Sequence, residues 1–72
     1  MKSKKLKKAF DEFVTEMDKR LTEKEEDGWN GWEYPESYHI NARMFYKLAN
    51  PTKKDYVDIA NFCMMLRRKL KK

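Results

Sequence analysis

The sequence contains only one cysteine, one histidine, two glycines and two prolines in 72 residues. Because a disulfide needs two cysteines, Cys63 cannot cross-link the chain internally. One cysteine and one histidine are also too few for a structural zinc site, which needs four nitrogen or sulfur ligands. A chain of this size buries only about 60% of the surface that its unfolded form exposes. We therefore expect oligomerisation to supply the stability that cross-links do not.

Long apolar runs are also missing from the sequence. No stretch approaches the ~18 apolar residues of a membrane span, and no apolar segment of the signal-peptide type follows the first lysines. We expect a cytoplasmic chain without a membrane partner, in which Cys63 is reduced. The sequence has neither an internal repeat nor a flexible linker, which indicates a single domain over residues 1–72.

The positive charge is concentrated at the two ends of the chain. The sequence carries 17 basic and 12 acidic residues, for a net charge of +5. Ten of the basic residues lie within 1–8 and 67–72, whereas 9–66 holds seven basic and twelve acidic residues. Basic ends can attract nucleic acid or another phosphate-rich partner. They can equally be solvated helix ends, and nucleic acid is the less favoured partner.

Apolar residues three or four positions apart predict helices rather than strands. The predicted helices cover about residues 4–26, 35–49 and 52–70. The predicted fold is an all-α three-helix unit that assembles into a homo-oligomeric helical bundle.

Local signals mark two of the helix ends. The pair Asp27-Gly28 predicts the end of the first helix, because glycine tolerates the left-handed conformation found there. The run Thr52-Lys53-Lys54-Asp55 is a variant capping box with aspartate in place of glutamate, and it predicts the start of the third helix. The apolar stripe expected on that helix makes Cys63 a small core residue. Its members are Tyr56, Ile59, Ala60, Cys63, Leu66 (or Met65) and Leu70.

Two groups of side chains are candidates for binding a nucleotide. Aromatic side chains in the glycine-containing loop at 28–35 could stack on a base, although they could equally seal the helix ends. A polar row at i, i+4 and i+8 on the second helix could bind phosphate oxygens, or could be a solvated face. With one asparagine of the third helix, the candidate ligand-binding residues are Trp29, Trp32, Tyr34, His39, Arg43, Lys47 and Asn61.

Four carboxylates are candidates for a metal site. Asp55 and Asp58 lie three residues apart on the third helix, so they share a face. Two such carboxylates could hold Mg²⁺, which prefers oxygen ligands and keeps several waters. Asp55 also fits the simpler role of a capping carboxylate. Glu23 and Glu26 have the same spacing on the first helix and could complete an acidic cluster.

Residues 55–66, DYVDIANFCMML, resemble the DVANFAMML helix of short viral and microbial proteins related to the MazG-like, all-α nucleoside triphosphate pyrophosphohydrolases. Residues 17–32, which include Gly28-Trp29-Asn30-Gly31-Trp32, are similar to the GWxGW element of the same proteins. The resemblance implies an all-α dimer or tetramer with a Mg²⁺ and nucleotide pocket. It also implies metal carboxylates from an E-x-x-E pair on one helix and an E-x-x-D pair on a later one.

The later pair maps onto Asp55 and Asp58, whereas residues 38–47, where the earlier pair should lie, contain no acid. Losing half of the metal ligands should remove most of the electrostatic stabilisation that hydrolysis needs. We therefore expect a non-catalytic oligomeric binder of a nucleotide or nucleotide-derived signal, which requires no cofactor. The resemblance implies a viral sponge that sequesters host immune signalling nucleotides. The alternative is a minimal Mg²⁺-dependent MazG-like pyrophosphohydrolase that uses Asp55 and Asp58 with Glu23 and Glu26.

Overall fold

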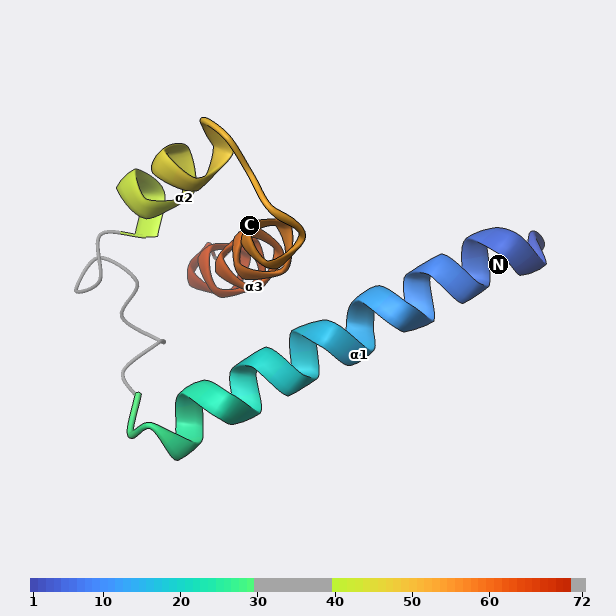
Figure 1. Ribbon diagram of the computed structural model, residues 1–72, viewed down its shortest axis with the longest axis horizontal. Coiled ribbons are helices and arrows are strands. Elements are labelled where there is room, and N and C mark those ends of the chain that lie inside the picture. The colour runs from blue at the N-terminus through green and yellow to red at the C-terminus, as the bar shows by residue number, and fades with distance from the viewer. Residues whose placement is uncertain (30–39, 71–72) are drawn as a thin grey trace.

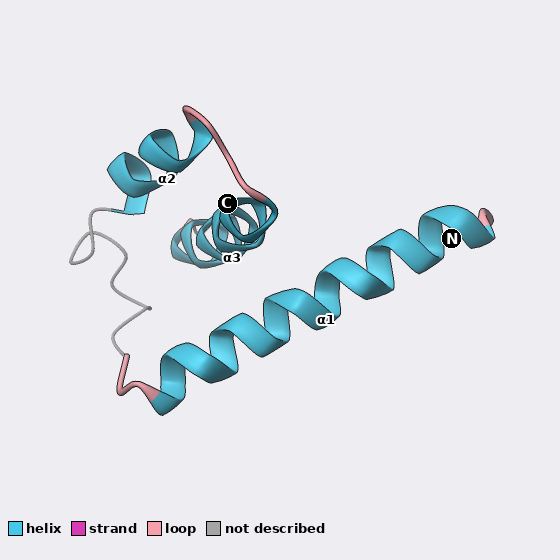
Figure 2. Ribbon diagram, in the orientation of Figure 1, coloured by secondary structure: helices cyan, strands magenta, loops and turns pink. Residues whose placement is uncertain are grey.

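The computed structural model describes residues 1–29 and 40–70. Within these ranges the chain forms three helices and no strand: α1 (Lys4–Glu26), α2 (Ile40–Leu48) and α3 (Lys53–Lys69). Helix α3 packs against both α1 and α2 (Figure 1). Figure 2 shows the short loop that joins α2 to α3. The prediction of an all-α unit with three helices is confirmed.

Both ends of α1 follow from local chemistry. The hydroxyl of Ser3 accepts a hydrogen bond from the backbone N–H of Leu6 at 3.1 Å, which satisfies a donor that has no partner inside the helix. After α1, Gly28 has a φ of +85°, in the left-handed region that glycine enters without steric cost. The predicted helix at 4–26 is confirmed at both ends.

Helix α3 begins at the predicted capping box. The hydroxyl of Thr52 accepts from the N–H of Asp55 at 3.2 Å, and the carboxylate of Asp55 accepts from the N–H of Thr52 at 2.9 Å. The helix ends at Lys69, one residue before the predicted end. Helix α2 ends at Leu48, also one residue early, and the predicted start of this helix lies outside the described residues.

A small apolar core joins the helices. Its buried members are Ile40 of α2 and Phe62 and Met65 of α3. The partly buried side chains around them are Leu21, Trp29, Met44 and Leu66. Because few apolar side chains of residues 1–29 and 40–70 are buried, polar contacts between the helices contribute to their packing.

The buried face of α3 differs from the predicted apolar stripe. Cys63 is exposed rather than part of the core, and Tyr56 and Leu70 are exposed as well. The prediction was wrong at these three positions, whereas Met65 is buried and Ile59, Ala60 and Leu66 are half-buried. It followed apolar residues alone, but two of the buried positions are polar and bind the other helices. The buried residues of α3 are Val57, Asp58, Asn61, Phe62 and Met65.

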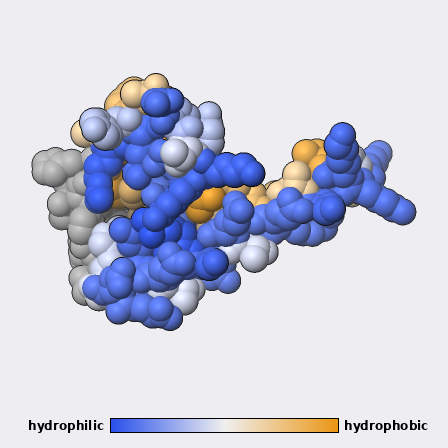
Figure 3. Space-filling view, in the orientation of Figure 1, coloured by the Kyte–Doolittle hydropathy of each residue, from blue (hydrophilic) through white to orange (hydrophobic). Residues whose placement is uncertain are grey.

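The N-terminal half of α1 projects beyond the other two helices (Figure 1). Leu6, Phe10 and Val14 on this half are 59%, 48% and 42% exposed. Figure 3 shows apolar surface on the projecting arm. Within the described ranges, no helix is long and apolar enough to cross a membrane.

Candidate functional site

A pocket of about 110 Å³ lies among the three helices. All three helices contribute to its walls, and Trp29 contributes from the segment that follows α1. Four of the lining side chains are basic and one is acidic, so the formal charge of the walls is positive. The lining residues are Arg20, Leu21, Lys24, Trp29, Arg43, Lys47, Asp58, Asn61, Phe62 and Met65.

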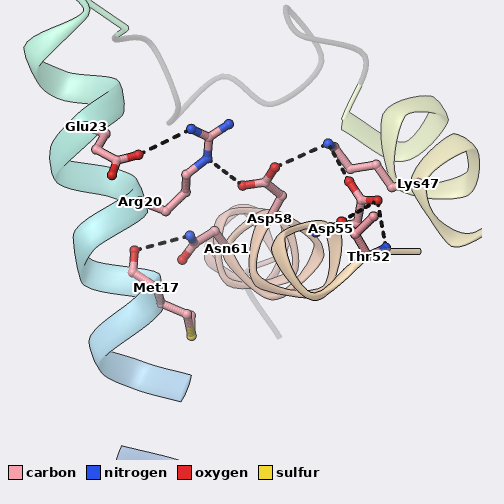
Figure 4. Close-up of polar contacts among 8 residues, drawn as sticks. All are labelled: Met17, Arg20, Glu23, Lys47, Thr52, Asp55, Asp58 and Asn61. Atoms are coloured by element: carbon pink, nitrogen blue, oxygen red, sulfur yellow. Dashed lines mark hydrogen bonds and ion pairs between the residues drawn. The ribbon is translucent and has the colours of Figure 1, made fainter. Parts of the chain in front are cut away.

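Asp58 links α3 to both other helices through two ion pairs. One carboxylate oxygen accepts from Nε of Arg20 at 2.9 Å, and the other accepts from Nζ of Lys47 at 3.2 Å. Figure 4 shows the carboxylate between the two basic side chains. Asp58 is only 6% exposed, and burying a carboxylate is costly unless it is paired. The hydrogen bond to Asp58 is the main reason why the pKa of Arg20 is raised.

Asp55 combines its capping role with an ion pair to α2. Its carboxylate lies 3.3 Å from Nζ of Lys47, the same nitrogen that binds Asp58. The backbone N–H and then the hydroxyl of Thr52 lower the pKa of Asp55 most, and Lys47 lowers it further. The carboxylate of Asp55 is therefore committed to the start of α3.

We expect acid to destabilise the fold in part through Asp55. Because its folded-state pKa lies below its unfolded value of about 3.9, the unfolded chain binds more protons between the two values. The contribution of Asp55 is present above the unfolded pKa and is lost as pH falls through the folded pKa. Thermal unfolding followed by circular dichroism, from neutral pH down through this window, should show a smaller acid-induced loss in Asp55→Asn. The exposed Asp11→Asn should lose as much stability in acid as the wild type. A loss in Asp55→Asn that equals the wild-type loss would contradict the contribution of Asp55 to acid sensitivity.

Asn61 ties α3 to α1 and has one unsatisfied polar atom. Its side-chain amide donates to the backbone carbonyl of Met17 at 3.3 Å. Asn61 is 3% exposed, and its carbonyl oxygen has no hydrogen-bond partner in the described part of the chain. Leaving such an acceptor unsatisfied costs about 1–3 kcal/mol. A group that donates a hydrogen bond to this oxygen would recover that cost.

The pocket brings together four of the seven predicted ligand-binding residues. Trp29, Arg43, Lys47 and Asn61 all line it. They come from the segment after α1, from α2 and from α3, as expected if the helices converge on one site. The other three predicted residues lie outside the described residues: Trp32, Tyr34 and His39.

Two of the basic side chains in the pocket form no ion pair with a carboxylate in the described part of the chain. No acidic side chain within 1–29 or 40–70 forms an ion pair with Lys24 or Arg43. The guanidinium carbon of Arg43 lies 5.8 Å from the centre of the Phe62 ring, within the range of a cation–π contact. An anion that enters the pocket would therefore meet two cations that form no ion pair with a carboxylate of the described residues.

Sequence reasoning missed Arg20, Lys24 and Phe62 as site residues. Arg20 follows Glu16 by four residues, a spacing typical of a surface salt bridge, but it binds Asp58 on α3 instead. One signal could have found it. An aspartate between the apolar Val57 and Ile59 in a packed helix requires a cation from another segment.

The structure brings the candidate metal carboxylates only partly together. Asp55 and Asp58 both form ion pairs with Lys47, and Glu23 and Asp58 both form ion pairs with Arg20. Glu26 is exposed and forms no ion pair with a described residue. Basic side chains thus occupy the positions between the carboxylates. Among residues 1–29 and 40–70, no group of three or more histidine, cysteine, aspartate or glutamate side chains could hold a metal ion.

A scan against protein-family models and searches of curated proteins and of solved structures found no match to this chain.

Proposed function

We propose that this chain is a non-catalytic binder of a nucleotide or nucleotide-derived signal and works as a homo-oligomer. The observation that carries the proposal is a pocket in which basic side chains lie beside aromatic rings. Lys24 and Arg43 supply cations without a carboxylate partner in the described ranges, and Trp29 and Phe62 supply aromatic walls. A phosphate group binds to the first kind of surface and a base stacks on the second.

The size of the pocket supports partial enclosure of the ligand. A volume of about 110 Å³ is smaller than the ~300–1,000 Å³ of sites that enclose a drug-sized molecule. The pocket has room for one compact group, and the rest of a nucleotide would lie at its mouth. Partial enclosure by one chain supports an oligomer in which a second copy covers the remainder of the ligand.

The ion pairs support binding without hydrolysis. Pyrophosphate chemistry of the MazG-like type needs carboxylates that hold Mg²⁺ at the phosphates. Here Asp55 and Asp58 are neutralised by basic side chains of the same chain. Under this proposal the chain requires no cofactor and sequesters a cytoplasmic signalling nucleotide, as a viral sponge of host immune signals would.

Calorimetric titration with mononucleotides and cyclic dinucleotides, with and without EDTA, tests the proposal. We expect binding that EDTA does not weaken, with the ligand recovered intact. Mg²⁺-dependent release of pyrophosphate would instead establish the alternative, a minimal MazG-like pyrophosphohydrolase. Binding to mixed-sequence DNA with a steep salt dependence, without nucleotide binding, would indicate that the basic ends are a nucleic-acid site.

Charge reversal at Arg43 should weaken nucleotide binding at least tenfold. A hydrogen bond to a charged group contributes about 1.5–3 kcal/mol, and about 1.4 kcal/mol corresponds to a factor of ten. The matched control is Arg67→Glu, which makes the same charge change at an exposed position of α3 that does not line the pocket. Calorimetry should show a loss in Arg43→Glu alone. Equal losses in both variants would mean that net charge, and not the pocket, determines affinity.

A further inference from the structure

We propose that the N-terminal half of α1 pairs in an antiparallel arrangement with the same segment of a second copy of this chain. The proposal rests on the oligomeric part of the proposed function, for which it names the interface, and is independent of the ligand. Its starting point is the projecting arm, which carries exposed apolar side chains (Figure 3).

The exposed apolar stripe on the N-terminal half of α1 continues the face by which α1 packs on α3. Leu21 packs against the core, and the backbone carbonyl of Met17 accepts a hydrogen bond from α3. Towards the N-terminus, Val14, Phe10 and Leu6 follow at helical spacing and are increasingly exposed. This face of α1 is therefore covered by α3 towards its C-terminal end and exposed towards its N-terminal end. Such a pattern is expected when another chain covers the exposed end.

The charges along α1 favour an antiparallel partner of the same sequence. Residues 4–14 hold four lysines and two acidic residues, whereas residues 15–27 hold six acidic and three basic residues. A parallel pair would place halves of like charge side by side. Antiparallel pairing centred between Phe10 and Val14 places Lys7 and Lys8 of one copy beside Glu16 and Asp18 of the other. A two-fold axis makes both sets of contacts the same.

The chain exposes more surface than a compact protein of its mass. The surface area is 6307 Å², whereas a compact protein of 8.8 kDa exposes about 4,800 Å². The chain as a whole therefore exposes about 1,500 Å² more than a compact fold, and a typical stable interface takes roughly 800 Å² from each partner. The radius of gyration of 13.4 Å also exceeds the ~11 Å of a compact chain of this length.

Sedimentation equilibrium of the chain without nucleotide tests the interface. We expect a dimer in the wild type and at least a tenfold weaker dimer in Phe10→Glu, with the helical circular dichroism retained. The matched control is Tyr56→Glu on the outer face of α3, because Tyr56 is 53% exposed and Phe10 is 48% exposed. This control should remain dimeric. A dimer that survives Phe10→Glu and dissociates in Tyr56→Glu would overturn the proposed interface.

Cross-linking tests the orientation of the pair. In a Cys63→Ser background, Leu6→Cys should not form an intermolecular disulfide, because antiparallel pairing puts the two copies of position 6 at opposite ends of the contact. An efficient disulfide at this position would overturn the antiparallel arrangement. A wild-type chain that is monomeric at all concentrations would overturn both the interface and the proposed oligomer, while nucleotide titrations would still report on the pocket.

Discussion

Replacing Asp58 by alanine should destabilise the folded chain by about 3 kcal/mol. The carboxylate is 6% exposed, and its removal leaves Arg20 and Lys47 without the anion between them. The two basic side chains are 22% and 26% exposed, so both regain some hydration. This places the expected loss at the low end of the ~3–5 kcal/mol for a broken buried ion pair. A domain of this length has a total stability of about 4–11 kcal/mol, so the loss is a large share of it.

Urea unfolding followed by circular dichroism measures the effect against a matched control. The control is Asp11→Ala, which also loses an ion pair, because a carboxylate oxygen of Asp11 lies 2.7 Å from Nζ of Lys7. That pair is shorter than either pair of Asp58, but its side chains are 55% and 57% exposed. We expect Asp11→Ala to cost less than about 0.5 kcal/mol. Similar losses in the two variants would contradict the importance of burial at Asp58.

The same position separates binding from hydrolysis. Asp58→Asn keeps the shape of the side chain, removes its charge and leaves Arg20 and Lys47 more available to a phosphate group. A non-catalytic binder should therefore retain or gain nucleotide affinity in this variant. A Mg²⁺-dependent pyrophosphohydrolase should instead lose activity, because one of its metal ligands would be gone.

The helix ends of this chain could be predicted because they depend on contacts within a few residues. Thr52 and Asp55 satisfy each other's backbone groups across one turn, and Gly28 can adopt its positive φ because glycine has no Cβ. The packing face of α3 is different, because it depends on a cation 38 residues away in the sequence. Apolar periodicity could not reveal that the buried face includes Asp58 and Asn61.

The candidate site shows the same division between local and distant information. Arg43 and Lys47 were predicted because their spacing of four residues places them on one side of α2. Lys24 and Phe62 were missed because nothing near them in the sequence indicates that α1 and α3 meet at a pocket. It was also not predictable that Arg43 forms no ion pair with a described carboxylate, since this depends on which cations the carboxylates of α3 bind in three dimensions.

Truncation of Ile40 to alanine should cost about 3 kcal/mol. Ile40 is 1% exposed and is the only buried residue of α2. A helix of nine residues is too short to be stable alone, so α2 depends on packing. The truncation would leave a cavity beside Phe62 and Met65, and the lost contacts add to the lost transfer free energy. Urea unfolding of Ile40→Ala measures the sum of these effects.

Two variants of the same helix serve as controls for this prediction. Ile40→Val should cost only about 0.5–1.5 kcal/mol because it removes one methyl group, and Leu48→Ala should cost less than Ile40→Ala because Leu48 is 48% exposed. Arg43 and Lys47 of α2 line the pocket. If Ile40→Ala detaches α2 from α3, it should therefore also weaken nucleotide binding. A loss no larger than that of Leu48→Ala would mean that the ion pairs of Lys47, and not apolar packing, hold α2 on α3.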